Sequence, residues 1–112
     1  MKKILIIDDE PDSIEVFELL LTNLNYEVVS ESNPLNAIKM IQTTQPDLVI
    51  LDWLMPQMEG IEVLSKIKST LEIKEIPVII SSGIRTQSSN LQTALSVGAI
   101  DFLKKPIDEI EL

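Results

Sequence analysis

The sequence of 112 residues contains no cysteine and no histidine. The absence of cysteine excludes a disulfide framework. The absence of histidine removes the commonest general base, the commonest zinc ligand and any Ser-His-Asp triad. Chemistry in this chain must therefore rest on carboxylates, hydroxyls and amines.

Long apolar runs and glycine-rich motifs are also missing. No apolar stretch approaches the roughly 20 residues that cross a bilayer. The apolar run at 4–7 is followed directly by three acidic residues. That run is typical of a first strand rather than a signal peptide. The three scattered glycines cannot form the G-x-G-x-x-G motif of dinucleotide-binding folds. We therefore expect a cytoplasmic protein that does not contact a membrane.

Basic residues are scarce, since nine lysines and arginines face 18 acidic residues and the net charge is −9. Such a chain is a poor candidate for binding the phosphate backbone of nucleic acid directly, although a separate output domain could do so. The length predicts one domain that spans residues 1–112.

Apolar runs of strand length alternate with stretches of helical period, which predicts five βα repeats and a parallel sheet with helices on both faces. The runs at 4–7, 48–51 and 78–80 are apolar on both faces and should be central. The runs at 26–30 and 100–104 include polar positions and should form the edges. Pro11 and Pro34, the latter behind an Asn33 cap, mark helix starts, and Gly98 marks a helix end. This pattern fits a doubly wound sheet of order 2-1-3-4-5.

Acidic residues follow two of the predicted central strands. In this strand order the carboxyl ends of the first and third strands flank the ligand-binding crevice, so Asp8 and Asp9 should lie beside Asp52. At ~4 Å and an effective dielectric of about 20, each pair of like charges costs on the order of 4 kcal/mol. The cluster therefore calls for a cation, and Mg²⁺ suits a few carboxylates together with waters and phosphate oxygens.

Hydroxyls and amines follow the other two strands at the same edge. Ser81 and Ser82 come after the fourth strand, and Lys104 and Lys105 come after the fifth. One hydroxyl and one ammonium group should face the crevice. Mg²⁺ and one lysine would neutralise three carboxylates, which leaves the carboxylate of Asp52 able to attack phosphorus.

These residues resemble the receiver domains of two-component response regulators over essentially the whole chain. The resemblance rests on four motifs in order: IIDDEP, LVILDWLMPQMEG, PVIISSG and GAIDFLKKP. It implies a flavodoxin-like fold, here with a truncated fifth helix because the chain stops at Leu112. It also implies that Asp52 is phosphorylated, and that Asp8, Asp9, Asp52 and the backbone carbonyl of Leu54 bind Mg²⁺.

The resemblance further assigns the switch residues. In receivers the hydroxyl lies five residues after the proline that opens the fourth strand, which selects Ser82 over Ser81. Lys105, directly before Pro106, corresponds to the amine that pairs with the phosphoryl group. Phe102 corresponds to the aromatic residue that swings inward when the hydroxyl is drawn to the phosphoryl group.

The function implied is phosphoryl acceptance from a histidine kinase or a histidine phosphotransfer protein, followed by a change in the face made by helix four, strand five and helix five. The chain would catalyse only its own phosphorylation and dephosphorylation and would not be an enzyme in the usual sense. Its partner downstream would be an output domain or protein, and a homodimer through the helix-four face is a further option.

Two alternative functions remain open from the sequence. A receiver-like module can signal without phosphorylation, but such variants typically lose the acceptor or an acid, and this chain keeps both. A Mg²⁺-dependent phosphatase that forms an aspartyl phosphate would carry a second acid two residues after the nucleophile, where this sequence has Leu54. Trp53 can be either an exposed interaction residue or a packed one.

Overall fold

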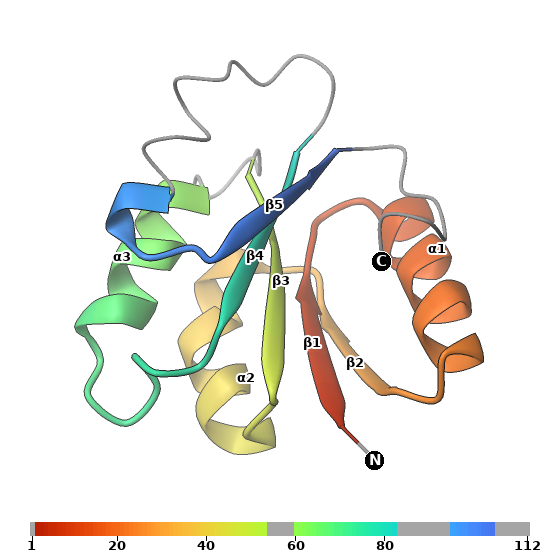
Figure 1. The fold of residues 1–112 in the computed structure, drawn as a ribbon, viewed down its shortest axis with the longest axis horizontal. Helices are drawn as coiled ribbons and strands as arrows, with labels where there is room; N and C mark the ends of the chain where they lie inside the picture. Colours follow the sequence, from red (N-terminus) through yellow and green to blue (C-terminus); the bar gives the residue numbers. More distant parts are fainter. Residues whose placement is uncertain (1, 54–59, 83–94, 105–112) are drawn as a thin grey trace.

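The computed structural model describes residues 2–53, 60–82 and 95–104 (Figure 1). These residues contain a five-stranded sheet of order β2-β1-β3-β4-β5, in which every neighbouring pair is parallel. The strands are β1 (Lys3–Ile7), β2 (Glu27–Glu31), β3 (Leu48–Asp52), β4 (Val78–Ser82) and β5 (Asp101–Lys104). The predicted strand order is confirmed, and the two more polar strands are the edges.

The helical segments in the described residues include α1 (Pro11–Asn23), the 3₁₀ turn η1 (Pro34–Asn36), α2 (Ala37–Thr44) and α3 (Gly60–Ser69). Two of them, α1 and η1, begin at the predicted prolines Pro11 and Pro34. Proline is suited to a first helical turn because the N–H it lacks would have no partner there. The side chain of Asn33 accepts a hydrogen bond from the Leu35 N–H at 3.0 Å, which confirms the predicted cap. No helix in these described ranges is long and apolar enough to cross a membrane.

The central strands alternate their side chains between two apolar layers. On one face, Phe17 and Leu21 of α1 pack against Ile4, Ile6 and Ile50 of the sheet. On the other face a larger cluster lies under α2 and α3 and includes the following residues: Leu5, Ile7, Val49, Leu51, Val63, Leu64 and Ile67. Figure 1 shows α1 on the opposite side of the sheet from α2 and α3. Burial on both faces explains why β1 and β3 are continuous apolar runs.

A lysine at the end of α3 ties together the segments that precede β4 and β5. Lys68 Nζ donates to the backbone carbonyls of Lys74 and Ile76, both at 3.1 Å. Its aliphatic stem packs on Gly98, where an added Cβ would lie 3.1–3.2 Å from the stem carbons. Gly98 has a φ of 136°, so the predicted helix end there is confirmed. Burial lowers the pKa of Lys68, and the nearby carboxylate of Glu75 opposes that shift.

The predicted helix after β4 lies mostly outside the described residues, and the predicted truncated fifth helix lies wholly outside them. Residues 95–97 are helical and lead into the turn at Gly98.

Candidate functional site

The site begins at the carboxyl ends of β1 and β3, the two central strands that pair directly. Ile7 pairs with Leu51, so the residues that follow, Asp8 and Asp52, are neighbours at the same edge of the sheet. Asp8 is 1% exposed and Asp52 is 3% exposed. Both carboxyl groups are therefore held at the rim of the apolar core, where charge interactions are stronger than in water.

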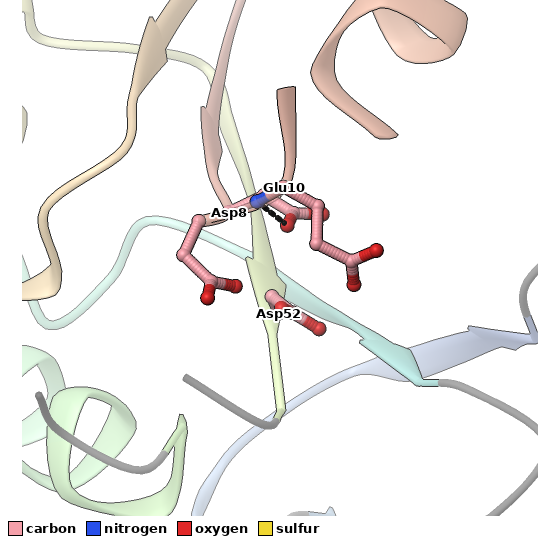
Figure 2. A group of neighbouring side chains, drawn as sticks. Asp8, Glu10 and Asp52 are labelled. Atoms are coloured by element: carbon pink, nitrogen blue, oxygen red, sulfur yellow. Dashed lines mark hydrogen bonds between the residues drawn. The ribbon is translucent and has the colours of Figure 1, made fainter. Parts of the chain in front are cut away.

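Two hydrogen bonds fix the turn that carries the first acids. The Asp8 N–H donates to the Glu31 carbonyl at 3.1 Å, which anchors the end of β1 to the end of β2. The Glu10 N–H donates to Asp8 Oδ1 at 2.9 Å, an Asx-type contact that turns the chain toward α1. Figure 2 shows Asp8, Glu10 and Asp52 around the end of β3, with this hydrogen bond dashed. The turn thereby holds the first acids next to Asp52.

Four carboxylates meet at this point. Asp8, Asp9, Glu10 and Asp52 each place one carboxylate oxygen within 4.8 Å of the others. At an effective dielectric of ~20, two unit charges at that separation repel by about 3–4 kcal/mol. Asp9 Oδ1 is also buried and has no hydrogen-bond partner among the described residues. An all-oxygen donor set with concentrated negative charge fits a hard divalent cation such as Mg²⁺.

Glu10 is the member of the cluster that was not predicted as a site residue. Its residue occupies the N-cap position of α1, but its side chain makes no capping hydrogen bond. Its carboxylate belongs instead to the acidic group at the strand ends. The signal available in the sequence was its place directly before Pro11, which fixes the first helical turn next to the crevice.

The other predicted residues are described only in part. Ser82 ends β4 opposite Lys104 of β5, and Phe102 pairs with Ile80, so the backbones of strands four and five end at the same edge as the acids. The side chains of Ser82 and Phe102 are not described. Leu54 and Lys105 lie outside the described residues. The structure therefore brings Asp8, Asp9 and Asp52 together and places the strand that leads to Lys105 beside Ser82.

Trp53 and Gly60 connect the end of β3 to the start of α3. The Trp53 side chain is 6% exposed and belongs to the apolar cluster under α2 and α3, so it is a packed residue. The Gly60 N–H donates to the Trp53 carbonyl at 2.8 Å. The first turn of α3 is thus fixed to the end of β3, directly next to Asp52.

Comparison with known proteins agrees with this geometry. The family model of the response regulator receiver domain matches residues 4–112. Response regulator PleD of Caulobacter vibrioides is 34% identical over 110 residues, which cover 98% of this chain and 24% of that protein. The transcriptional regulatory protein KdpE of Mycobacterium tuberculosis is 39% identical over 106 residues, which cover 95% of this chain and 45% of that protein. The chain thus spans less than half the length of these relatives.

Solved structures show the same fold. The chemotaxis protein CheY4 of Vibrio cholerae superposes with a TM-score of 0.90 at 26% identity and covers 99% of this chain and 92% of its own. The N-terminal domain of a response regulator receiver protein from Methanoculleus marisnigri gives a TM-score of 0.86 at 28% identity, over 95% of this chain and 85% of that one. With its acidic cluster, its strand order and its family match, this chain belongs to the response regulator receiver domain family.

Proposed function

We propose that this receiver domain accepts a phosphoryl group on the carboxylate of Asp52, from a phosphohistidine of a histidine kinase or a histidine phosphotransfer protein. One observation carries the proposal: Asp52 is buried at a strand end and shares a carboxylate cluster with Asp8, Asp9 and Glu10. Residues 1–112 contain no histidine that could hold the phosphoryl group, so the donor phosphohistidine must lie outside this domain.

Each of the other residues has a distinct role in this proposal. Mg²⁺, held by Asp8, Asp9, Asp52 and the backbone carbonyl of Leu54, would neutralise negative charge on the incoming phosphoryl oxygens. Lys105 pairs with the phosphoryl group as a second positive charge.

The signal would then pass through two further residues. The Ser82 hydroxyl is drawn toward the transferred phosphoryl group, and Phe102 follows it inward. This movement reshapes the face made by helix four, strand five and helix five.

The wider setting is also a proposal. We assign residues 1–112 to one receiver module that catalyses only its own phosphorylation and dephosphorylation. Its output would be a downstream domain or protein, because the relatives are more than twice as long as the matched segment. Homodimerisation through the helix-four face is one route for that output. The cysteine-free sequence fits a reducing compartment, so we place the module in the cytoplasm.

The test is phosphorylation by acetyl phosphate, followed by intact mass spectrometry. We expect one phosphoryl group per chain in the presence of Mg²⁺ and none after chelation by EDTA. A phosphatase would instead turn over phosphomonoesters continuously without keeping a stoichiometric label. Continuous turnover, or a label that forms equally well in EDTA, would contradict the proposal.

The metal assignment predicts a specific loss of affinity in Asp9→Asn. Removing one anionic ligand should weaken Mg²⁺ binding by roughly tenfold or more, because the remaining carboxylates hold the cation with less charge. Trp53, the only tryptophan, is buried and follows Asp52 directly, so its fluorescence can report the titration. Asp12→Asn, an exposed aspartate on α1, is the matched control and should bind Mg²⁺ like the wild type. Equal affinities for the two variants would remove Asp9 from the metal site.

A further inference from the structure

Ser81 is the cross-strand neighbour of Asp52. The two residues are Cα partners in the parallel pairing of β3 and β4. Paired residues in parallel strands project to the same face of the sheet, and neighbouring strands are about 4.8 Å apart. Ile50, two residues before Asp52, packs in the α1 layer, whereas Ile80, directly before Ser81, packs in the opposite layer. Because successive side chains in a strand alternate between the two faces of the sheet, the side chains of both Ser81 and Asp52 lie on the α1 face.

The Ser81 hydroxyl is buried without a partner in the part of the chain that the structure describes. Ser81 is 0% exposed, and its Oγ makes no hydrogen bond to any described residue. Folded proteins leave few buried hydroxyls in this state, because a hydroxyl that loses water without gaining a partner is destabilising. An alanine or valine would fill the same place in the strand without this penalty. The hydroxyl therefore requires an explanation beyond packing.

We propose that Ser81 is a positioning residue for the acceptor, an inference that rests on the proposed function of Asp52. Its hydroxyl donates a hydrogen bond to the Asp52 carboxylate oxygen that does not attack. The two side chains extend from paired backbone positions on one face, so rotation about their side-chain bonds can bring the hydroxyl to the carboxylate. A hydrogen bond to a charged oxygen is stronger than one between neutral groups. It holds the carboxylate in one rotation and aims the other oxygen at phosphorus.

The transfer step leaves Ser81 chemically unchanged. A bond forms between the attacking Asp52 oxygen and phosphorus, and the bond from phosphorus to the donor atom breaks. The donor leaves with that electron pair, which for acetyl phosphate gives acetate. Ser81 keeps its proton throughout and remains bonded to the other oxygen, which becomes the carbonyl oxygen of the aspartyl phosphate. This role is separate from the switch role proposed for Ser82, one residue further along β4.

The experiment compares Ser81→Thr with Ser81→Val, two side chains of the same shape that differ in the hydroxyl. The rate of labelling by acetyl phosphate is measured by intact mass at saturating Mg²⁺. We expect Ser81→Val to be labelled about tenfold more slowly than the wild type, which corresponds to about 1.4 kcal/mol of lost transition-state stabilisation. Ser81→Thr should stay within about twofold of the wild type. The Mg²⁺ affinity reported by Trp53 should be the same in both variants, because Ser81 is not a metal ligand.

Other results would overturn the inference. A wild-type rate in Ser81→Val would show that the hydroxyl has no role. Equal slowing in both variants would show that side-chain volume is responsible. Should the branched side chains prevent folding, Ser81→Ala repeats the test without added volume. We expect its labelling rate to be about tenfold below that of the wild type, as predicted for Ser81→Val. A wild-type rate in Ser81→Ala would likewise overturn the inference. Asp52→Asn separates the two proposals. If that variant is labelled, Asp52 is not the acceptor. If Asp52→Asn is not labelled but Ser81→Val is labelled at the wild-type rate, only the role of Ser81 is contradicted.

Discussion

Asp52→Asn should not be labelled by acetyl phosphate in the presence of Mg²⁺, and its folded state should be more stable than the wild type. The amide has nearly the shape of the carboxylate but lacks the anionic oxygen that attacks phosphorus, so the rate should fall by at least roughly a hundredfold. The same change removes one negative charge from four carboxylates that lie within 4.8 Å of one another. Relief of that repulsion should raise the free energy of unfolding by about 1–2 kcal/mol without Mg²⁺.

The two expected effects have opposite signs, which makes Asp52→Asn informative. A loss of labelling caused by misfolding would be accompanied by a lower midpoint of urea unfolding, whereas we expect a higher one. Asp12→Asn is again the matched control, because it makes the same chemical change on the exposed surface of α1. It should be labelled like the wild type. A stoichiometric label on Asp52→Asn would show that another residue is the acceptor.

Gly60→Ala should lower the free energy of unfolding by about 3 kcal/mol, the largest loss of stability that we expect from adding a single methyl group. A Cβ at this position would lie 2.7 Å from the Asp52 carbonyl oxygen, 2.8 Å from Trp53 Cα and 3.0 Å from the Trp53 carbonyl oxygen. All three are backbone atoms of β3 and of Trp53, which follows it, so they cannot move aside by rotating a side chain. The start of α3 must instead separate from the end of β3.

Thermal or urea unfolding measures this effect, and for a domain of this size the midpoint should fall by roughly 10 °C. Ser65→Ala makes the control, because it adds alanine at an exposed position of the same helix and should change the midpoint little. The Mg²⁺ response of Trp53 fluorescence should also weaken in Gly60→Ala, since the displaced atoms belong to Asp52 and Trp53. A midpoint within about 2 °C of the wild type would show that α3 can shift at little cost.

The fold was predictable because the sequence patterns that indicate strands and helix ends are strong. The residues of 4–7 and 48–51 are apolar at every position, which distinguishes buried parallel strands from the half-polar runs at 26–30 and 100–104. Pro11, Pro34 and Gly98 then set the helix boundaries. The remaining boundary differences are small, such as β4, which continues through Ser81 and Ser82 rather than ending at Ile80. Serine has no strong strand signal, and pairing with β3 and β5 decides its conformation.

The site was predictable to the extent that topology alone determines it. Strand order brings Asp8 and Asp9 to Asp52 across more than forty residues of sequence, and this required no knowledge of side-chain contacts. The directions of individual side chains at the site were harder to predict from the sequence. Glu10 is exposed and could equally have capped α1. The Asx turn made by Asp8 leads into Glu10, whose carboxylate lies in the acidic cluster. The burial of Ser81 likewise depends on its register with Asp52, which no local sequence pattern specifies.

Asp52, the proposed acceptor, ends β3, which like β1 and β4 has hydrogen-bonded neighbours along both edges. β1 and β3 also have apolar layers on both faces. β1 is paired with β2 and β3, and β3 is paired with β1 and β4. Exposing the amides of either strand to solvent would mean breaking two ladders and both apolar layers at once, so their hydrogen exchange should require global unfolding. We therefore expect β1 and β3 to stay in place when Asp52 is phosphorylated as proposed, and the proposed conformational response to involve the elements nearer the β5 edge.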